Sequence, residues 1–500
     1  MYKETEEIYN KVIHITGKDR VKIDPFERRM YSHDLASLPK IMELGFKMMP
    51  DLVVKPKSAK EIAEIVKIAA QEGIPIVPRG GASWGLGGAM PVAGGIVLDL
   101  TRMNRIRDYD YDNHIVTVET GITWKTLYDT LLRKGYIIGS YPSSAMAATV
   151  GGWINTGGVG VGTYKYGSAM DHVKSLEVVL PTGKILETGN FRTSIFGGMD
   201  LNKLFFGSEG TLGIITRASM RIYPAPEELR PISHGFSNFR ELSQVVRQIT
   251  FSDVTPLHIS FLDRFHFDFL RDLGIHTPDP KIQGMLNIAL EGDSAVLDLE
   301  EKVLDKIAAK QKGQKQDAQI AKHEWDERFY ELRTKRAGPT ATLGEVFVPI
   351  SEMSNMVDST YRLIKRMKLR AAITGMVSDR NTVVFMPYYL SDERKLIRNM
   401  VSLSFVKKLG DLAFEQGGRP AGLGLFVSGN LKKMYGHGWD TMRELKAVLD
   451  PYDIMNPGKT TEGLTRFGIP LPPFTLNMGM NFMAWIKHLM TKDKKVIRWG

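Results

Sequence analysis

The chain has 500 residues, of which 43% are hydrophobic and 24% charged, a composition typical of a globular protein. It contains no cysteine, which excludes disulfides, cysteine-ligated iron–sulfur clusters or zinc, and a thiol-linked cofactor within this chain. The net charge of +10 arises from 66 basic residues interleaved with 56 acidic ones, so we expect a solvated basic surface and no nucleic-acid partner.

The first element that the pattern predicts is a helix that begins at the capping box Ser58–Glu61 and ends at Gly73. A short strand at Ile74–Val77 then leads into Pro78–Met90, which has five glycines in 13 residues. Further strands are predicted at Gly95–Leu100 and Ile115–Glu119, followed by a helix over Thr123–Arg133.

Glycine returns twice in the next hundred residues. A second glycine-rich segment covers Thr149–Ser168, and a third, mixed with β-branched residues, covers Leu204–Tyr223. Between them, Val173–Leu180 and Lys184–Thr188 read as the two strands of a hairpin. Each glycine-rich segment is therefore joined to β-type sequence.

Pro224–Pro226 predicts a domain boundary, because the composition and the residue pattern change after it. Glycine becomes rare, helical and strand patterns alternate, and Leu297–Ala321 reads as one charged, solvent-exposed helical stretch. Glycine returns around Gly417–Gly429, and Leu449–Lys459 ends the globular part. This pattern predicts two domains, with the chain returning to the first one after the second.

Glycine-rich loops let backbone N–H groups approach a phosphate without interference from a Cβ atom. A Rossmann fingerprint is excluded, because Gly80–Gly88 leads through Pro91 into another strand and not into a helix. A P-loop is excluded as well, because Gly458–Thr460 match the end of that motif but Asp453 stands where its first glycine is needed. The structural alternative is that these glycines only form turns, and the presence of three such loops argues against it.

Four ordered segments resemble the FAD-binding signatures of the vanillyl-alcohol oxidase / p-cresol methylhydroxylase superfamily: Pro78–Ser83, Tyr141–Gly158, Gly207–Thr216 and Leu449–Lys459. Within it, the glycolate oxidase and D-lactate dehydrogenase flavoproteins are most similar. The resemblance implies an α+β fold, with a two-subdomain FAD-binding domain of the p-cresol methylhydroxylase type and an α+β cap domain. The expected limits are an N-terminal segment (1–45), an FAD-binding domain (46–226), a cap domain (227–410), a segment returning to the flavin (411–465) and a tail (466–500).

The resemblance also implies which residues hold FAD. They are the pyrophosphate loop Arg79, Gly80, Gly81, Ala82, Ser83, Trp84 and Gly85, then Pro142, Ser143, Thr149, Gly151, Gly152 and Asn155, then Gly210, Gly213 and Ile214, and finally Asn456. We expect a Cβ at Gly81 or Gly151 to intrude where the backbone approaches phosphate. Ala82 stands where members with histidyl-linked flavin often carry histidine, so FAD is expected to be non-covalent, although a link from the cap domain stays open.

The hydroxyacid dehydrogenases that the chain resembles use a divalent metal held by histidines. The matching segment here is Gly375–Val383, in which Met376 and Val383 replace the two histidines. Neither side chain suits a hard divalent ion, and Gly417–Gly424 lacks the later Glu-His-Gly. We therefore predict that no metal is bound.

Three candidates for substrate chemistry follow. Arg328, in Trp325–Arg328, resembles the arginine that pairs with a substrate carboxylate, and an arginine on an exposed helix face is the alternative. His437 is a candidate general base because histidine titrates near neutrality. Tyr388, which follows the altered metal segment, is another, and Tyr389 lies beside it. For each candidate base a purely structural role is the alternative.

These features predict an FAD-dependent oxidoreductase that oxidises a hydroxyacid or an alcohol by hydride transfer to flavin. Since the chain has no cysteine, electrons are expected to pass to a separate acceptor, such as an iron–sulfur or electron-transfer protein. The alternative is a flavin-bearing electron-transfer or structural subunit of a larger complex, without a substrate of its own.

The tail combines apolar and basic residues. Prolines between Gly468 and Phe474 make a transmembrane helix improbable, whereas the sequence after Thr475 suits an amphipathic helix with Phe482, Trp485 and Ile486 on one side. Lysines and an arginine flank it, so residues 468–500 are expected to attach to a membrane surface, to a partner, or to the protein itself. Residues 1–13 lack an apolar core, so the expected location is the cytoplasm, with or without peripheral membrane contact.

Overall fold

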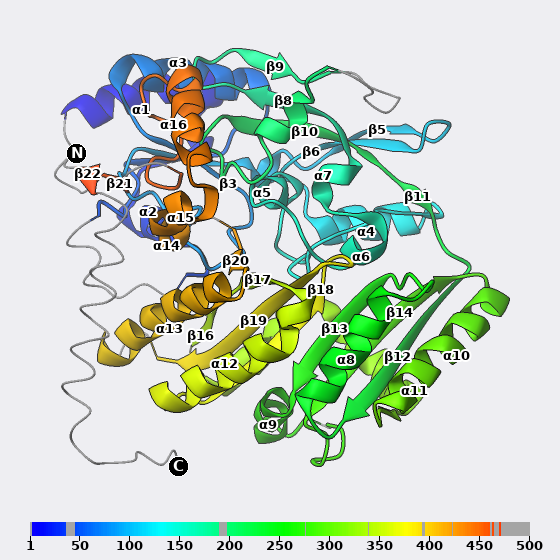
Figure 1. The fold of residues 1–500 in the computed structure, drawn as a ribbon. Coiled ribbons are helices and arrows are strands. Elements are labelled where there is room, and N and C mark those ends of the chain that lie inside the picture. The colour runs from blue at the N-terminus through cyan, green and yellow to red at the C-terminus, as the bar shows by residue number, and fades with distance from the viewer. Residues whose placement is uncertain are drawn as a thin grey trace.

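The computed structural model describes residues 3–36, 46–189, 198–275, 277–338, 340–392, 396–422, 424–460, 463–464 and 470–471. Figure 1 shows two small sheets with their helices in the upper part of the view and one large sheet in the lower part. This arrangement confirms the predicted α+β fold.

The first sheet has the order β1-β2-β4-β3, with β2, β4 and β3 parallel. Helices α1 (Lys3–Thr16) and α3 (Ala59–Glu72) share its hydrophobic core. The strands are β1 (Val21–Lys22), β2 (Leu52–Val54), β3 (Ile76–Arg79) and β4 (Ile96–Asp99). Because β3 runs parallel to β4 and β2, the glycine-rich loop that follows it starts at the carboxyl ends of these strands.

Helix α3 begins and ends where the sequence predicts. The Ser58 hydroxyl accepts a hydrogen bond from the Glu61 backbone N–H at 3.2 Å, and Gly73 adopts a left-handed conformation at the C-terminus. The other half of the capping box differs, because the Glu61 carboxylate accepts from Lys57 N and pairs with Arg20.

The second sheet is antiparallel, with the order β5-β6-β10-β8-β9. Its β8–β9 hairpin confirms the predicted one, and α4 (Trp124–Leu132) and α5 (Val150–Asn155) contribute to its core. The strands are β5 (Ile106–Asp110), β6 (Ile115–Glu119), β8 (Val173–Val179), β9 (Ile185–Glu187) and β10 (Ile214–Arg221).

The third sheet is larger and antiparallel, with the order β15-β12-β14-β13-β18-β19-β17-β20 and β16 also paired with β19. Its strands are β12 (Glu228–Phe236), β13 (His258–Asp263), β14 (Gly284–Gly292), β15 (Gln314–Lys315), β16 (Thr340–Leu343), β17 (Val346–Pro349), β18 (Ala371–Val377), β19 (Thr382–Ser391) and β20 (Arg419–Pro420). Figure 1 shows α8 (Phe239–Thr250) and α12 (Met353–Met367) in front of this sheet.

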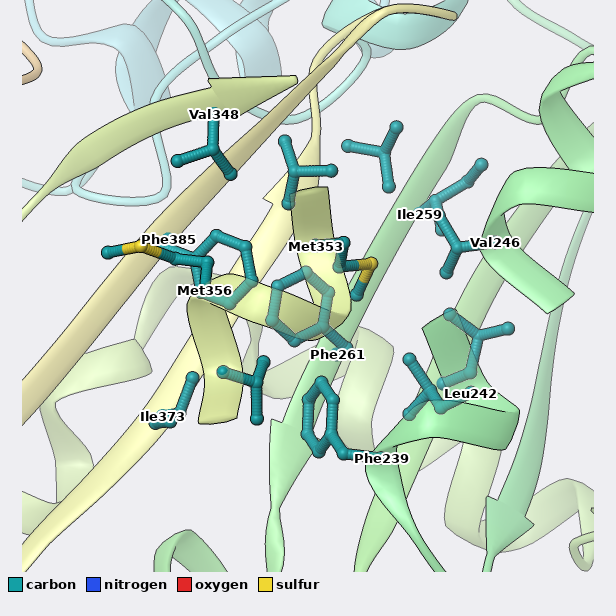
Figure 2. Packing of buried hydrophobic residues seen from close by; sticks show 14 of the residues in the cluster. Phe239, Leu242, Val246, Ile259, Phe261, Val348, Met353, Met356, Ile373 and Phe385 are labelled. Carbon is teal, nitrogen blue, oxygen red and sulfur yellow. The ribbon is translucent and has the colours of Figure 1, made fainter. Parts of the chain in front are cut away.

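The core between these helices and the third sheet is aromatic at its centre (Figure 2). Phe261 on β13 meets Phe239 of α8 and Phe385 of β19 edge to face, with ring centroids 5.6 and 5.3 Å apart. Helix α8 reaches this core because its apolar residues recur at helical spacing, as Leu242 and Val246 illustrate.

The prediction of one exposed helical stretch over Leu297–Ala321 is wrong. Helix α10 (Ser294–Lys310) is followed by strand β15 and then by α11 (Ala318–Asp326). The interruption falls at Gly313, where a Cβ would lie 2.6 Å from the Phe236 ring, so the chain packs against the sheet at this point. Leu297 and Leu304 are buried, so α10 is amphipathic and not fully exposed.

After β20 the chain returns to the first sheet. Helices α14 (Gly424–Val427), α15 (Leu431–Tyr435) and α16 (Gly438–Leu449) run back to the upper part of the view (Figure 1). Met455 then pairs with Ile76 in β3. The domain limits at residues 45, 226, 410 and 465 stay predictions.

Within the described ranges, no helix has the length and apolar character needed to cross a bilayer. The amphipathic helix predicted after Thr475 and the basic residues around it lie outside the described residues.

Candidate functional site

A cavity of about 1310 Å³ lies where the two small sheets meet the third sheet, and we call it the main cavity. Its glycine-loop side is formed by the loops that follow β3 and surround α5, and its cap side by β16 to β19 and their neighbours. The volume exceeds the roughly 300–1,000 Å³ of a usual small-molecule pocket. One cavity therefore has room for a dinucleotide and a small second ligand together.

The loop after β3 presents free backbone donors to the main cavity. The N–H groups of Gly80, Gly81, Ala82 and Ser83 donate no hydrogen bond to any described residue, and all four residues line the cavity. Ala82 also has a φ of +48°, which is uncommon for a residue with a side chain. Consecutive unpaired N–H groups around a concave surface are suited to an anion such as a pyrophosphate.

The glycines of these loops are required for a different reason than the sequence suggested. A Cβ at Gly81 would lie 1.8 Å from the carbonyl oxygen of Ala147, and one at Gly151 would lie 2.8 Å from Thr120 Cβ. The expectation that these atoms would meet a phosphate is therefore corrected, because they would first collide with neighbouring protein segments. Glycine lets the loops pack backbone against backbone, and this packing shapes the cavity.

Most of the residues predicted to hold FAD line the main cavity. They are Arg79, Gly80, Gly81, Ala82, Ser83, Trp84, Gly85, Pro142, Ser143, Thr149, Gly151, Gly152, Asn155 and Gly210. Gly213, Ile214 and Asn456 are not among its lining residues. Their part in binding FAD, like that of the lining residues, stays a prediction.

The three residues outside the lining support the loops from behind. Gly213 lies against β8, where a Cβ would be 2.7 Å from Val178 Cγ1, and Ile214 is fully buried in the core of the first sheet. Asn456 is buried and its side-chain amide donates to the carbonyl oxygens of Gly88 and Glu209, at 2.9 and 2.6 Å. Asn456 therefore ties the first glycine loop to the third.

Two predicted residues hold the loops together from inside the cavity wall. The Asn155 side-chain oxygen accepts from Ser208 Oγ and from Gly210 N, both at 3.1 Å, and so joins the second loop to the third. The Arg79 guanidinium donates to the carbonyl oxygen of His33 at 2.8 Å and lies over the Tyr31 ring. Burial lowers the pKa of Arg79, so this cation is held partly away from water.

Trp84 links the two sides of the main cavity. Its indole N–H donates to the Glu345 carboxylate at 3.1 Å, and Glu345 lies just before β17 on the cap side. The ring lies so close to Gly422 that a Cβ there would be 2.0 Å from it. The glycine loop and the returning C-terminal segment are thereby fixed against the third sheet.

The cap side combines an apolar wall with a few polar groups. Phe347, Met376 and Met386 supply the apolar surface, and the Tyr388 side chain also lines the cavity. Arg336 and Arg419 line it as well, are exposed, and form no ion pair with a described carboxylate. Sequence reasoning missed both arginines, although Arg336 lies only eight residues after the candidate Arg328.

A second cavity of about 70 Å³ lies beside the main one, between α11 and the third sheet, and we call it the inner chamber. Arg328 lines this chamber and not the main cavity. Its Nε donates to the Tyr141 hydroxyl at 3.1 Å, and its guanidinium lies 4.2 and 4.3 Å from the ring centroids of Trp325 and Phe329.

The other candidate bases are placed differently from one another. Tyr388 reaches the main cavity, whereas Tyr389 is buried in the core next to Phe405. His437 is exposed at the start of α16 and lines neither cavity. The structure therefore brings only Tyr388, among the three proposed catalytic residues, to the main cavity.

The segment predicted to have lost its metal ligands, Gly375–Val383, forms the end of β18, the following turn and the start of β19. Met376 lines the main cavity, and Val383 is fully buried in the core of the cap. Among the described residues, no three histidine, aspartate or glutamate side chains are grouped so that they could share a metal ion. The absence of a metal stays a prediction.

Comparison with known proteins fits this geometry. The family model "FAD binding domain" matches residues 50–189, and "FAD linked oxidases, C-terminal domain" matches residues 225–460. Glycolate oxidase subunit GlcD of Bacillus subtilis (strain 168) is 30% identical over 471 residues, which cover 91% of this chain and 97% of that protein. The chain belongs to the FAD-linked oxidases of the vanillyl-alcohol oxidase / p-cresol methylhydroxylase superfamily.

Two further comparisons agree. D-lactate dehydrogenase of Anaerostipes hadrus is 28% identical over 481 residues, which cover 91% of this chain and 98% of that protein. A structure of p-cresol methylhydroxylase with substrate bound superposes with a TM-score of 0.80 at 20% identity, covering 92% of this chain and 97% of that chain. The predicted family, fold and cofactor are confirmed: this is an FAD-linked oxidoreductase. The free N–H groups of the first glycine loop fit that cofactor.

Proposed function

We propose that the protein oxidises the CH–OH group of a small hydroxyacid or alcohol and passes the electrons to a separate acceptor. The observation that carries this proposal is the shape of the main cavity, which continues past the glycine loops into the cap side. A subunit that only carried electrons would need no such second compartment. When bound, the flavin ring supplies the acceptor for a hydride from substrate carbon.

Each part of the cavity has a role in this proposal. The N–H groups of Gly80 to Ser83 hold the pyrophosphate, and the apolar wall of Phe347, Met376 and Met386 excludes water from the reacting carbon. Arg336 and Arg419 are available to a substrate carboxylate, because neither has a carboxylate partner among the described residues. The names of the two relatives refer to glycolate and D-lactate, both hydroxyacids, which favours an acidic substrate.

The acceptor is proposed to be another protein, because the chain has no cysteine with which to hold an iron–sulfur cluster of its own. An iron–sulfur or electron-transfer protein fits this role. Residues 468–500 are a proposed attachment to that partner or to a membrane surface, and the proposed location is the cytoplasm with or without such contact.

The test is an anaerobic screen of the purified yellow protein with a panel of 2-hydroxyacids and matched alcohols, with and without EDTA. We expect at least one hydroxyacid to bleach the flavin absorbance and EDTA to leave the rate unchanged, since Met376 and Val383 cannot bind a metal. If no compound bleaches the flavin, the subunit without a substrate is the better account. Loss of activity in EDTA that zinc or manganese restores would contradict the proposed metal-free site.

We also expect acid to release about one FAD per chain, because Ala82 offers no nucleophile for a covalent link. Absorbance at flavin wavelengths that stays with the precipitated polypeptide would instead reveal a covalent attachment from the cap.

A further inference from the structure

Tyr388 is joined to a histidine that faces away from the main cavity. Its hydroxyl lies 2.9 Å from Nδ1 of His266, which is on α9 (Arg264–Asp272), and both side chains are 2% exposed. Burial lowers the pKa of His266 to about 3 and raises the pKa of Tyr388, so both groups are neutral around pH 7. The pair is therefore a hydrogen bond between a neutral phenol and a neutral imidazole.

The far side of His266 opens into the inner chamber. His266 Nε2 is buried and has no hydrogen-bond partner, and His266 lines the chamber. Two other chamber residues also carry a buried nitrogen without a partner, Nδ1 of His258 and Nε of Arg333. Leaving three buried polar atoms without hydrogen bonds would destabilise the fold.

Water bound in the chamber would remove this cost. A volume of about 70 Å³ holds about two water molecules, and a buried water needs two to four polar partners. The three unsatisfied nitrogens supply such partners. Glu327 lines both the chamber and the main cavity, and its side chain is 31% exposed.

We propose that Tyr388 and His266 form a proton relay, which carries the hydroxyl proton of the substrate from the main cavity to water in the inner chamber. This proposal rests on the proposed oxidation of a CH–OH group. Tyr388 is the catalytic residue of the relay because it lines the main cavity, and His266 acts through it.

The relay balances protons and electrons. As the substrate C–H bond gives its hydride to FAD, the substrate O–H bond breaks and its proton passes to the Tyr388 oxygen. The Tyr388 proton moves to His266 Nδ1, and the Nε2 proton of His266 moves to chamber water. The substrate leaves as a carbonyl compound, two electrons stay on the flavin, and one proton reaches the chamber.

The relay requires one tautomer of His266 before substrate binds. Nδ1 must accept from the Tyr388 hydroxyl and Nε2 must carry the hydrogen that points into the chamber. Histidine labelled with ¹⁵N reports this tautomer by NMR in the full-length, FAD-loaded protein, with the signal assigned by its loss in His266→Asn. We expect the Nε2–H form, and an Nδ1–H form would overturn the relay because Tyr388 would then accept the hydrogen bond.

The second arm measures flavin reduction in single turnovers, using the hydroxyacid or alcohol that bleaches the flavin fastest in the screen. His266→Asn keeps a polar group near Nδ1 but has nothing in the place of Nε2, and Tyr388→Phe keeps the ring without the hydroxyl. We expect the wild type to reduce its flavin more slowly in D₂O than in H₂O. We expect each variant to retain FAD, to slow reduction by about 10²-fold or more, and to lose this solvent isotope effect.

His234→Asn is the matched control. His234 is a buried histidine on β12 of the same sheet, but its Nε2 is paired with Asp305 and it lines neither cavity. We expect its reduction rate and its solvent isotope effect to equal those of the wild type. A His266→Asn protein that matches the wild type in both would contradict the relay.

The third arm needs no substrate. A crystal structure of the FAD-loaded protein should show ordered water within hydrogen-bond distance of His266 Nε2 and His258 Nδ1, and a dry chamber would overturn the proposal. If no compound bleaches the flavin, the proposed function fails and the relay has no proton to carry. If substrates bleach it but the tautomer is reversed or the chamber is dry, only the relay fails.

Discussion

The two sides of the main cavity are built from different parts of the protein chain. The glycine-loop side presents backbone N–H groups from four consecutive residues, Gly80 to Ser83. The cap side presents side chains from strands far apart in the sequence, and its Tyr388 depends on a histidine 122 residues away. A site made of consecutive backbone groups can therefore be recognised from a short sequence motif. A site made of side chains from several strands forms only when the sheet folds, so no single motif identifies it.

The largest effect that would test this difference is expected at Gly81. Valine at this position would place its Cβ 1.8 Å from the Ala147 carbonyl oxygen, so the two loops would have to separate. We expect Gly81→Val to lose FAD altogether, measured as the ratio of flavin to protein absorbance after gel filtration. Gly438→Ala is the control, because a Cβ there would lie 4.0 Å from its nearest neighbour and Gly438 lines neither cavity. A yellow Gly81→Val protein would contradict the packing of the loops.

The next effect concerns the cap side. Gln in place of Arg336 removes a guanidinium that lines the cavity without a carboxylate partner among the described residues. We expect Arg336→Gln to raise KM for a hydroxyacid about tenfold, or about 1.4 kcal/mol, and to leave KM for the matched alcohol unchanged. Arg240→Gln is the control, since Arg240 is an exposed cap arginine that lines neither cavity. An equal effect on hydroxyacid and alcohol would show that Arg336 does not recognise a carboxylate.

Arg328, the predicted carboxylate anchor, lines the inner chamber and not the main cavity. The sequence pattern Trp-x-x-Arg is present, but the guanidinium is stacked between Trp325 and Phe329 and bonded to Tyr141. We expect Arg328→Lys to lower the free energy of unfolding by about 1–2 kcal/mol, because lysine loses the planar stacking and the Tyr141 bond. Thermal unfolding measures this effect. If KM for hydroxyacids rises sharply while the melting temperature stays constant, Arg328 is the carboxylate anchor after all.

The smallest effect comes from Asp263, which lies behind the cap side at the start of α9. Burial raises its pKa to about 7 from an ordinary value of 3.8, and the Tyr361 hydroxyl donates to it at 3.0 Å. Between about pH 4 and pH 7 the folded protein binds more protons at this group than the unfolded chain does, so its contribution to stability falls as pH rises.

Asp263→Asn removes this titration. We expect the difference in melting temperature, variant minus wild type, to increase by about 2–4 °C from pH 5 to pH 8. A difference that does not change with pH would mean that Asp263 stays ionised in the fold.

The elements predicted best from sequence are those with local signals. The helix over Ala59–Glu72 begins at a serine cap and ends at a left-handed glycine, and the β8–β9 hairpin surrounds a Pro-Thr-Gly turn. Both depend on neighbours in the chain. The single helix predicted over Leu297–Ala321 was wrong because its interruption at Gly313 depends on Phe236, which is distant in sequence.

The same distinction explains the site. The loop predicted to hold the pyrophosphate follows β3 directly, and its residues, which the motif identified, line the main cavity. Asn456 was also predicted to hold FAD, but it joins two loops and does not line the main cavity. The inner chamber could not be predicted, because His258 on β13, His266 on α9 and Arg333 in the segment Glu331–Ala337 are distant in sequence and meet only in the folded protein.

The central claim is that one cavity holds FAD on backbone groups and the substrate on cap side chains, and a crystal structure of the protein with bound FAD tests it most directly. We predict pyrophosphate oxygens about 2.7–3.2 Å from the N–H groups of Gly80 to Ser83, with the flavin ring and Tyr388 facing the same open space. Pyrophosphate bound away from this loop, or a flavin ring that leaves no space beside Tyr388, would contradict the claim.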